Sequence, residues 1–125
     1  MKPISTKKAP GAIGPYSQAI QAGDFVYTSG QLGLDPQTSA FPEGGIKEQA
    51  RQSLNNVKAI LEKAGLSMAN VVKTTVVLAN MEDFAEMNSV YAEFFTEPYP
   101  ARSAVAVKTL PKNALVEIEV VAAMK

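Results

Sequence analysis

The chain has 125 residues, of which 46% are apolar and 19% are charged, a size and composition typical of one globular domain. Twelve Lys and Arg balance twelve Asp and Glu, so the chain lacks the broad positive charge that supports sequence-independent binding of nucleic acid or an anionic membrane. It contains no Cys and no His, which excludes disulfides, thiol nucleophiles, imidazole bases and the usual zinc sites. We therefore expect a single domain over residues 1–125, with no metal, whose chemistry depends on carboxylates, Arg, Lys, hydroxyl and backbone groups.

The N-terminal segment has no sign of a targeting or membrane-spanning function. Residues 1–10 are polar and bear Lys, and they lack the apolar core of a secretory signal. No segment approaches the about 18 consecutive apolar residues of a membrane-spanning helix. The sequence thus predicts a cytoplasmic protein.

Two short segments that follow have the composition of strands. Residues 17–22 and 25–30 are joined by Gly23-Asp24, a two-residue turn signal, and together they predict a β-hairpin. Residues 31–45 contain two Pro and three Gly, which predicts a loop.

From Ile46 onward, apolar residues recur every three or four positions, as they do on the buried face of a helix. These positions are Ile46, Ala50, Leu54, Val57, Leu61 and Ala64. Gly65 follows them, at the place where a left-handed residue commonly ends a helix. The pattern predicts a helix over residues 46–64.

Residues 71–79 form a β-branched run with apolar side chains on both alternating faces, which is typical of a strand covered on both sides. Asn80 can cap a second helix that ends before Pro98 and Pro100. Its expected buried positions are Phe84, Met87, Val90 or Tyr91, and Phe94.

Two further strands, over residues 102–107 and 115–123, complete the order β-β-α-β-α-β-β. This order predicts an α+β sandwich with both helices on one face of a mixed sheet.

The alternation of the last two strands predicts what lies on the sheet face that the helices leave open, if these strands are neighbours. The set expected under the helices is Ser103, Val105 and Val107 with Val116, Ile118 and Val120. The set expected on the open face is Arg102, Ala104 and Ala106 with Glu117, Glu119 and Val121. That face could be solvated, with an Arg–Glu surface pair worth at most about 1 kcal/mol. Its apolar content favours instead an oligomer interface where an Arg and a carboxylate line a small site.

An ordered set of motifs covers nearly the whole chain. The motifs are Ile13-Gly14-Pro15-Tyr16-Ser17-Gln18-Ala19, Ser29-Gly30-Gln31, Asp35-Pro36, Gln49-Ala50-Arg51-Gln52 with Asn55-Asn56, Asp83-Phe84 with Asn88, Pro100-Ala101-Arg102-Ser103, and Val116-Glu117-Ile118-Glu119. Together they resemble the Rid family of reactive-intermediate deaminases, also called the YjgF family.

The resemblance implies a chorismate-mutase-like α+β fold and a homotrimer with three ligand sites at the subunit interfaces. It also implies hydrolysis of enamines and imines, such as 2-aminoacrylate, 2-iminopropanoate and 2-iminobutanoate, to 2-oxo acids and ammonia. These intermediates are released by pyridoxal-phosphate-dependent Ser and Thr dehydratases, which would make the protein part of metabolite damage control. The hydrolase itself would need no cofactor.

Three catalytic residues are implied by the same resemblance. Arg102 would clamp the substrate carboxylate through its planar guanidinium group, a bidentate contact that Lys cannot reproduce. Glu117 would orient or deprotonate the attacking water. Tyr16 would donate its hydroxyl near the reacting carbon, from the same or a neighbouring subunit; alternatively, it anchors a loop in the core.

Further substrate contacts are implied for Ser29, for the backbone of Gly30 and for Ala104. Where many family members have Cys, this chain has Ala104, so any role there belongs to its backbone carbonyl. Ser29 could instead mark a strand end where backbones approach closely. Glu119 is expected to be an intersubunit or solvated partner, and Asn88 to hold structure.

Three functions remain open at this point. Imines already hydrolyse in water, so acid–base help of about 10²- to 10⁴-fold would suffice for a hydrolase without His or Cys. A non-catalytic trimer that binds a carboxylate metabolite and regulates a partner enzyme would use Arg102 and depend less on Glu117. An endoribonuclease or translation inhibitor is disfavoured, because the net charge is zero and the chain has no His.

Overall fold

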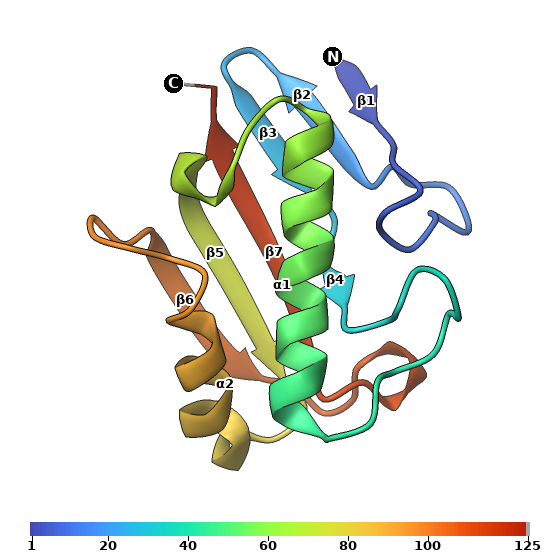
Figure 1. Ribbon diagram of the computed structural model, residues 1–125, viewed down its shortest axis with the longest axis vertical. Helices are drawn as coiled ribbons and strands as arrows, with labels where there is room; N and C mark the ends of the chain where they lie inside the picture. Colours follow the sequence, from blue (N-terminus) through green and yellow to red (C-terminus); the bar gives the residue numbers. More distant parts are fainter. Residues whose placement is uncertain (125) are drawn as a thin grey trace.

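The computed structural model describes residues 1–124, which form a seven-stranded mixed sheet with two α-helices packed against one face (Figure 1). The strands are β1 (Lys2–Ile4), β2 (Ala19–Ala22), β3 (Phe25–Thr28), β4 (Gln31–Leu32), β5 (Val71–Leu78), β6 (Ala101–Ala106) and β7 (Val116–Ala123). The helices are α1 (Ile46–Lys63) and α2 (Phe84–Tyr91), with short 3₁₀ turns η1 (Met68–Asn70), η2 (Met81–Asp83) and η3 (Pro111–Asn113). The predicted α+β fold is confirmed, with β1 and β4 as additional short strands.

The strand order is β1-β2-β3-β7-β5-β6, and β4 also pairs with β7. All pairs are antiparallel except β5 and β6, which are parallel. The predicted hairpin is present as β2 and β3, and Gly23 adopts a φ of 59° in its turn, a conformation that glycine reaches without steric cost. β7 therefore lies at the centre of the sheet, although it is the last strand of the chain.

The main helix covers the middle of this sheet, as its periodicity predicts. Leu54, Val57 and Leu61 of α1 are completely buried in a core shared with β7, whose Val116 and Ile118 are equally buried. Because β7 has one face under α1, its side chains alternate regularly between buried and more accessible positions. The buried set expected for this strand is correct.

The second helix is shorter than the sequence suggests. Asn80 accepts a hydrogen bond from the Glu82 backbone N–H at 2.9 Å and caps η2, and α2 follows from Phe84 to Tyr91. Met87, Val90 and Tyr91 are buried as expected, whereas Phe84 and Phe94 are half-buried. Phe95, beyond the helix, is the buried aromatic residue in this segment.

The expected pairing of the last two strands is wrong, because β5 lies between β6 and β7. In the parallel register, Arg102 pairs with the buried Thr74 and Ala104 pairs with the buried Val76. Arg102 and Ala104 therefore lie on the helix side of the sheet, and Ser103 lies on the open side. Alternation could not reveal this, because β6 is an edge strand on which five of six residues are exposed.

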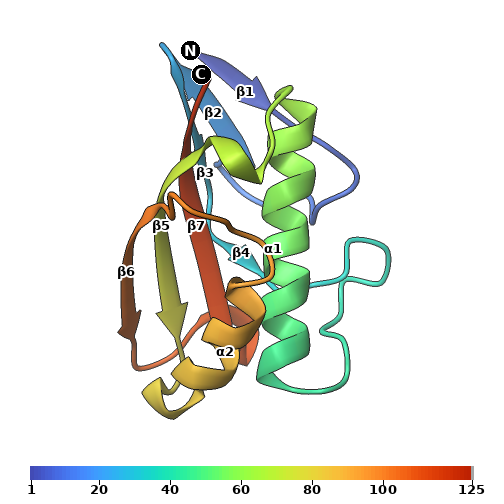
Figure 2. The same cartoon turned by 60° about the vertical axis from the view of Figure 1, so that its left-hand side comes forward.

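Figure 2 shows both helices on one side of the sheet and the other face without a covering element. Exposed aromatic and apolar side chains lie on this open face, among them Phe25 and Tyr27 of β3 and Val105 of β6, which are 41–49% exposed. The rings of Phe25 and Tyr27 are neighbours, with centres 6.4 Å apart. The Lys73 ammonium group donates a hydrogen bond to the Ser103 hydroxyl at 2.9 Å on the same face.

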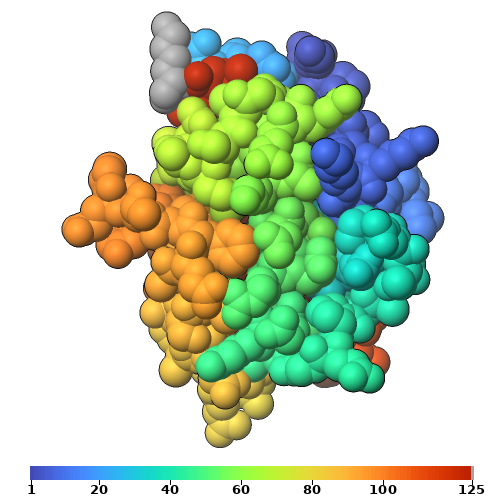
Figure 3. Space-filling model, in the orientation of Figure 1, coloured from blue at the N-terminus to red at the C-terminus, as the bar shows by residue number. Residues whose placement is uncertain are grey.

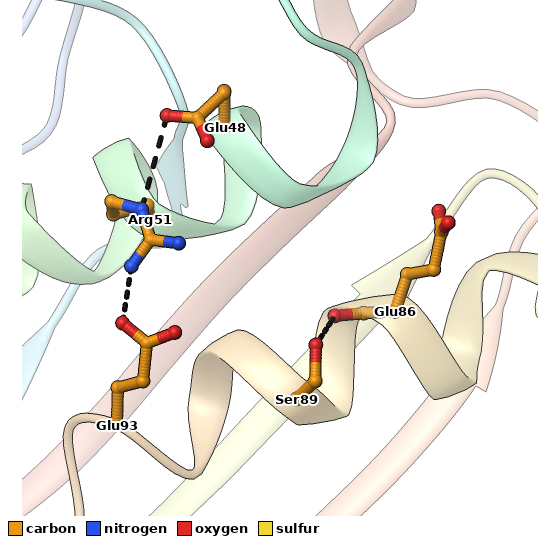
Figure 4. Close-up of polar contacts among 5 residues, drawn as sticks. All are labelled: Glu48, Arg51, Glu86, Ser89 and Glu93. Atoms are coloured by element: carbon orange, nitrogen blue, oxygen red, sulfur yellow. Dashed lines mark hydrogen bonds and ion pairs between the residues drawn. The ribbon is translucent and has the colours of Figure 1, made fainter.

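The helix face is the one seen in the space-filling view, where the segment between α2 and β6 stands out from the body at the left (Figure 3). Arg51 of α1 joins the two helical segments through an ion pair with Glu93, and it lies 3.8 Å from Glu48 (Figure 4). Within α2, the Ser89 hydroxyl donates to the Glu86 carbonyl at 2.7 Å. No helix within residues 1–124 combines the length and hydropathy that crossing a membrane requires.

Candidate functional site

A β-bulge separates β3 from β4 and shapes the candidate site. Tyr27 pairs with Val121 and Gln31 pairs with Ile118, so three residues of one strand, 28–30, face two residues of β7. The Thr28 hydroxyl accepts a hydrogen bond from the Val120 N–H at 3.0 Å and replaces a missing ladder contact. Bulges of this kind bend a strand and redirect its side chains, often beside active sites.

Gly30 lies in the bulge, directly against Glu117 of β7. A Cβ atom at residue 30 would lie 2.6 Å from Cδ and 2.8 Å from Cγ of Glu117, closer than real Cβ atoms come to their neighbours. The close approach of the Glu117 carboxyl group to this backbone therefore requires glycine.

Ser29 connects the bulge to the segment before β2. Its hydroxyl donates a hydrogen bond to the Ser17 carbonyl at 2.6 Å, and its N–H donates to the Gln18 carbonyl at 2.8 Å. The structural role considered for Ser29 is thus present, and the hydroxyl oxygen retains acceptor capacity for a ligand.

Tyr16 lies in the same N-terminal segment and is 54% exposed, so it does not anchor a loop in the core. Its N–H donates to the Gly14 carbonyl at 2.9 Å in a tight turn. The anchor is Gln18, which is 3% exposed. Its side-chain amide donates to the carbonyls of Thr6, Ala9 and Pro10 and accepts from the Thr6 N–H, at 2.7–3.3 Å. Sequence reasoning gave Gln18 no role of its own. Its place within a motif and directly before β2 was the one feature that could have pointed to it.

Four of the six expected site residues line one open cavity of about 730 Å³: Tyr16, Ser29, Gly30 and Glu117. Its apolar wall includes Ile13, Leu32, Leu34 and Pro111. Lys112, in the loop before β7, is the cation of the cavity wall and has a φ of 57°, in the left-handed region. The cavity thus combines apolar walls with a few polar groups, as small-molecule sites do.

Arg102 and Ala104 do not reach this cavity. The Arg102 guanidinium group lies over α2, where its Nη1 donates to Asn88 Oδ1 at 2.6 Å. Glu117 lies on the opposite face of the sheet, with β5 between the two strands. The expectation that Arg102 and Glu117 share a face is therefore wrong within one chain.

The ionisation of Glu117 is shifted by its surroundings. Partial burial, and secondly the negative charge of Glu119, raise the pKa of the Glu117 carboxyl group. Within residues 1–124 no Lys or Arg forms an ion pair with Glu117 that would offset these effects. A carboxyl group with a raised pKa inside a cavity is suited to accepting and returning a proton. No cluster of three acidic side chains that could hold a metal ion occurs in the described part of the chain.

Fold and site together define a small α+β protein with a carboxyl group of raised pKa in an open cavity and an Arg on the edge strand of the same sheet. A family model described as Endoribonuclease L-PSP matches residues 6–124. The chain belongs to this family, which is the Rid/YjgF family that its motifs resemble.

Named relatives match over nearly the full length. The chain is 56% identical over 119 residues to the RutC family protein PH0854 of Pyrococcus horikoshii, covering 95% of this chain and 94% of that protein. It is 50% identical to the human 2-iminobutanoate/2-iminopropanoate deaminase, over 95% of this chain and 87% of that one. The crystal structure of Escherichia coli TdcF with bound serine superimposes with a TM-score of 0.95 at 48% identity, covering 100% of both chains.

Proposed function

We propose that this protein hydrolyses reactive 2-imino acids and their enamine tautomers to 2-oxo acids and ammonia. Examples of these substrates are 2-aminoacrylate, 2-iminopropanoate and 2-iminobutanoate. The observation that carries the proposal is the Glu117 carboxyl group, which has a raised pKa and is held against Gly30 in a cavity beside Tyr16. The name of the human relative, at 50% identity, supports the same substrate class. The proposal places the reaction in the cytoplasm, beside pyridoxal-phosphate-dependent Ser and Thr dehydratases, in metabolite damage control.

The chemistry needs one group that first accepts and then returns a proton. The substrate enters as the imine with a protonated nitrogen, which 2-aminoacrylate becomes when its methylene carbon takes a proton from solvent. Water adds to the carbon of this C=N bond while Glu117 takes one of its protons, giving a neutral carbinolamine. The protonated Glu117 then donates to the nitrogen, the C–N bond breaks and ammonia leaves, while the hydroxyl proton passes to Glu117 or to water as the C=O bond forms. A carboxyl group with a raised pKa serves both steps. The Tyr16 hydroxyl, at the exposed side of the cavity, would donate a hydrogen bond near the reacting carbon.

The substrate carboxylate needs a cation, and the proposal assigns this role to Arg102 of a second subunit. One chain cannot use both residues on one small ligand, because Arg102 and Glu117 lie on opposite faces of the sheet. A homotrimer would resolve this if Arg102 and the Ala104 backbone of one subunit faced the cavity of the next. The exposed Phe25, Tyr27 and Val105 on the open face support such an assembly.

A non-catalytic carboxylate-binding regulator is the second candidate, and one observation favours it. The superimposable TdcF structure holds serine, an amino acid that itself carries a carboxylate. Binding of this kind would require Arg102 but would tolerate a neutral residue 117. The endoribonuclease named in the family description is the weakest candidate, because the net charge is zero and the chain has no His.

A coupled assay tests the proposed hydrolase. A threonine dehydratase releases 2-iminobutanoate, semicarbazide traps it, and a hydrolase lowers the amount trapped. We expect the wild type to lower trapping and Arg102→Lys to lose this effect while remaining folded, because a point charge replaces the bidentate fork. Glu117→Gln should lose hydrolysis but keep its affinity for 2-oxobutanoate. Arg51→Lys, a surface change in the ion pair between the helical segments, is the matched control and should retain activity.

The same variants test the shared site. Each of Arg102→Lys and Glu117→Gln leaves the other residue intact, so subunit exchange between the two inactive proteins should restore about a quarter of the sites in a head-to-tail assembly. Unchanged trapping by the wild type at high protein concentration would contradict the hydrolase and favour the binding function. A monomer in light scattering, or no activity after subunit exchange, would contradict the shared site.

A further inference from the structure

The Arg102 side chain is held in place by residues of α2. Its Nη1 donates to Asn88 Oδ1 at 2.6 Å, and its Cζ lies 4.7 Å from the centre of the Tyr91 ring and 5.3 Å from that of Phe84. Both ring distances are within the range of cation–π attraction. Among residues 1–124, Nε and Nη2 of Arg102 make no hydrogen bond. These two atoms form an edge of the guanidinium group that can contact both oxygens of a carboxylate.

Tyr91 is the most firmly fixed of these contacts. It is 6% exposed, and its hydroxyl shares a hydrogen bond of 2.8 Å with the Thr74 hydroxyl, which is completely buried. Its ring packs against Phe95, with centres 4.6 Å apart. Thr74 is also the residue of β5 that pairs with Arg102 of β6. One residue therefore fixes both the ring and the strand that carries the guanidinium group.

Asn88 and Tyr91 together orient the Arg102 side chain. Asn88 binds one end of the guanidinium group, and the Tyr91 ring supports its flat face, whereas Nε and Nη2 of this exposed residue make no hydrogen bond within residues 1–124. A long Arg side chain ordinarily loses rotational freedom when it binds a ligand. An Arg already held against a fixed ring loses less, so a carboxylate binds it more tightly.

We propose that Tyr91 is a positioning residue for the carboxylate clamp: its ring, fixed by Thr74, holds Arg102 with one guanidinium edge free for the carboxylate of a 2-imino or 2-oxo acid. The inference rests on the proposed function, because that function supplies the ligand. The carboxylate is bound equally in the substrate and in the transition state. Loss of the ring therefore raises KM and leaves kcat unchanged.

Three variants separate positioning from general damage to α2. Tyr91→Leu removes the aromatic face and keeps apolar bulk, whereas Tyr91→Phe keeps the face and removes the hydroxyl. Val90→Ala is the matched control, because Val90 is buried at the adjacent position of the same helix and its apolar side chain forms neither a hydrogen bond nor a cation–π contact with Arg102. The measurements are KM and kcat for imine hydrolysis, the Kd of 2-oxobutanoate by calorimetry, and thermal unfolding.

Tyr91→Leu should raise both KM and the 2-oxobutanoate Kd by about 3- to 10-fold, with kcat within about two-fold of the wild type. Tyr91→Phe keeps the ring face but loses the hydrogen bond to Thr74, so it should raise both constants by less than Tyr91→Leu does. Val90→Ala should keep both constants within about two-fold, because Tyr91 and its bond to Thr74 are intact. A Tyr91→Leu protein that binds 2-oxobutanoate as tightly as Val90→Ala overturns the inference, and so does an equal loss of binding in all three variants.

The proposed function can fail separately. A wild type that binds 2-oxobutanoate without hydrolysing imines overturns the hydrolase, and weaker binding by Tyr91→Leu then still supports the positioning role. A wild type that binds no 2-oxobutanoate overturns the inference as well as the assigned role of Arg102.

Discussion

Replacing Gly30 by Ala tests whether the placement of the Glu117 carboxyl group controls activity. The added Cβ would lie 2.6 Å from Cδ and 2.8 Å from Cγ of Glu117, whereas ordinary contacts begin at 3.4 Å. The Glu117 side chain must therefore move by about 0.8 Å, since the β-bulge holds the backbone of residue 30 between two paired strands.

The cost in stability should be small. The clashing atoms belong to the outer part of a flexible side chain, and Gly30 does not adopt a left-handed φ, so Ala fits its backbone. Ala also restricts the unfolded chain, which contributes about 0.4–1 kcal/mol in favour of folding. The free energy of unfolding should therefore change by less than about 1 kcal/mol. The rate of imine hydrolysis should fall by about 10²-fold, because a displacement near 1 Å can cost that much.

The imine-trapping assay and chemical denaturation, run on the same preparations, measure both quantities. Gly11→Ala is the matched control, because its Cβ would meet no atom within 4 Å and its φ is not left-handed. Full activity in Gly30→Ala would refute the reasoning. A Gly30→Ala protein that does not fold would refute the prediction that the substitution lowers activity while it leaves stability nearly unchanged.

Three further predictions concern the same region. Glu119→Gln removes one of the two causes that raise the pKa of Glu117, so the acid limb of the kcat/KM profile should move to lower pH; an unmoved limb would contradict Glu117 as the base. Where the pKa of a carboxyl group is higher in the folded than in the unfolded state, the protein becomes less stable as the pH rises above the pKa of the unfolded state. Glu117→Gln should therefore raise the Tm at pH about 7 but not at about 4, and a lower Tm at neutral pH would count against this. Gln18→Ala should lower the free energy of unfolding by about 1–3 kcal/mol and speed hydrogen exchange in residues 6–16, and slow exchange there would show that another contact holds the segment.

Elements with local signals could be predicted from the order of the amino acids. The period of α1 and its end shortly before Gly65, which has a φ of 81°, follow from neighbouring residues. The buried face of β7 could be identified because one side of that strand is completely covered, so its alternation is regular. The ordered motifs identified the family, and they contain Tyr16, Ser29, Gly30 and Glu117, which lie together around the cavity. β1 and β4, with three and two residues, are too short to leave a pattern.

Which strands are neighbours, and therefore which residues share a face, depends on contacts between distant parts of the chain. β5, β6 and β7 are separated along the chain by a helix and loops, and no local signal places β5 between the other two. Within one strand, successive side chains point to opposite faces of the sheet. Which of the two sets lies under the helices depends on the strands that pair with it. For this reason the sequence could place Arg102 and Glu117 in motifs that resemble those of the family, whereas only the fold showed that one chain holds them on opposite faces of its sheet.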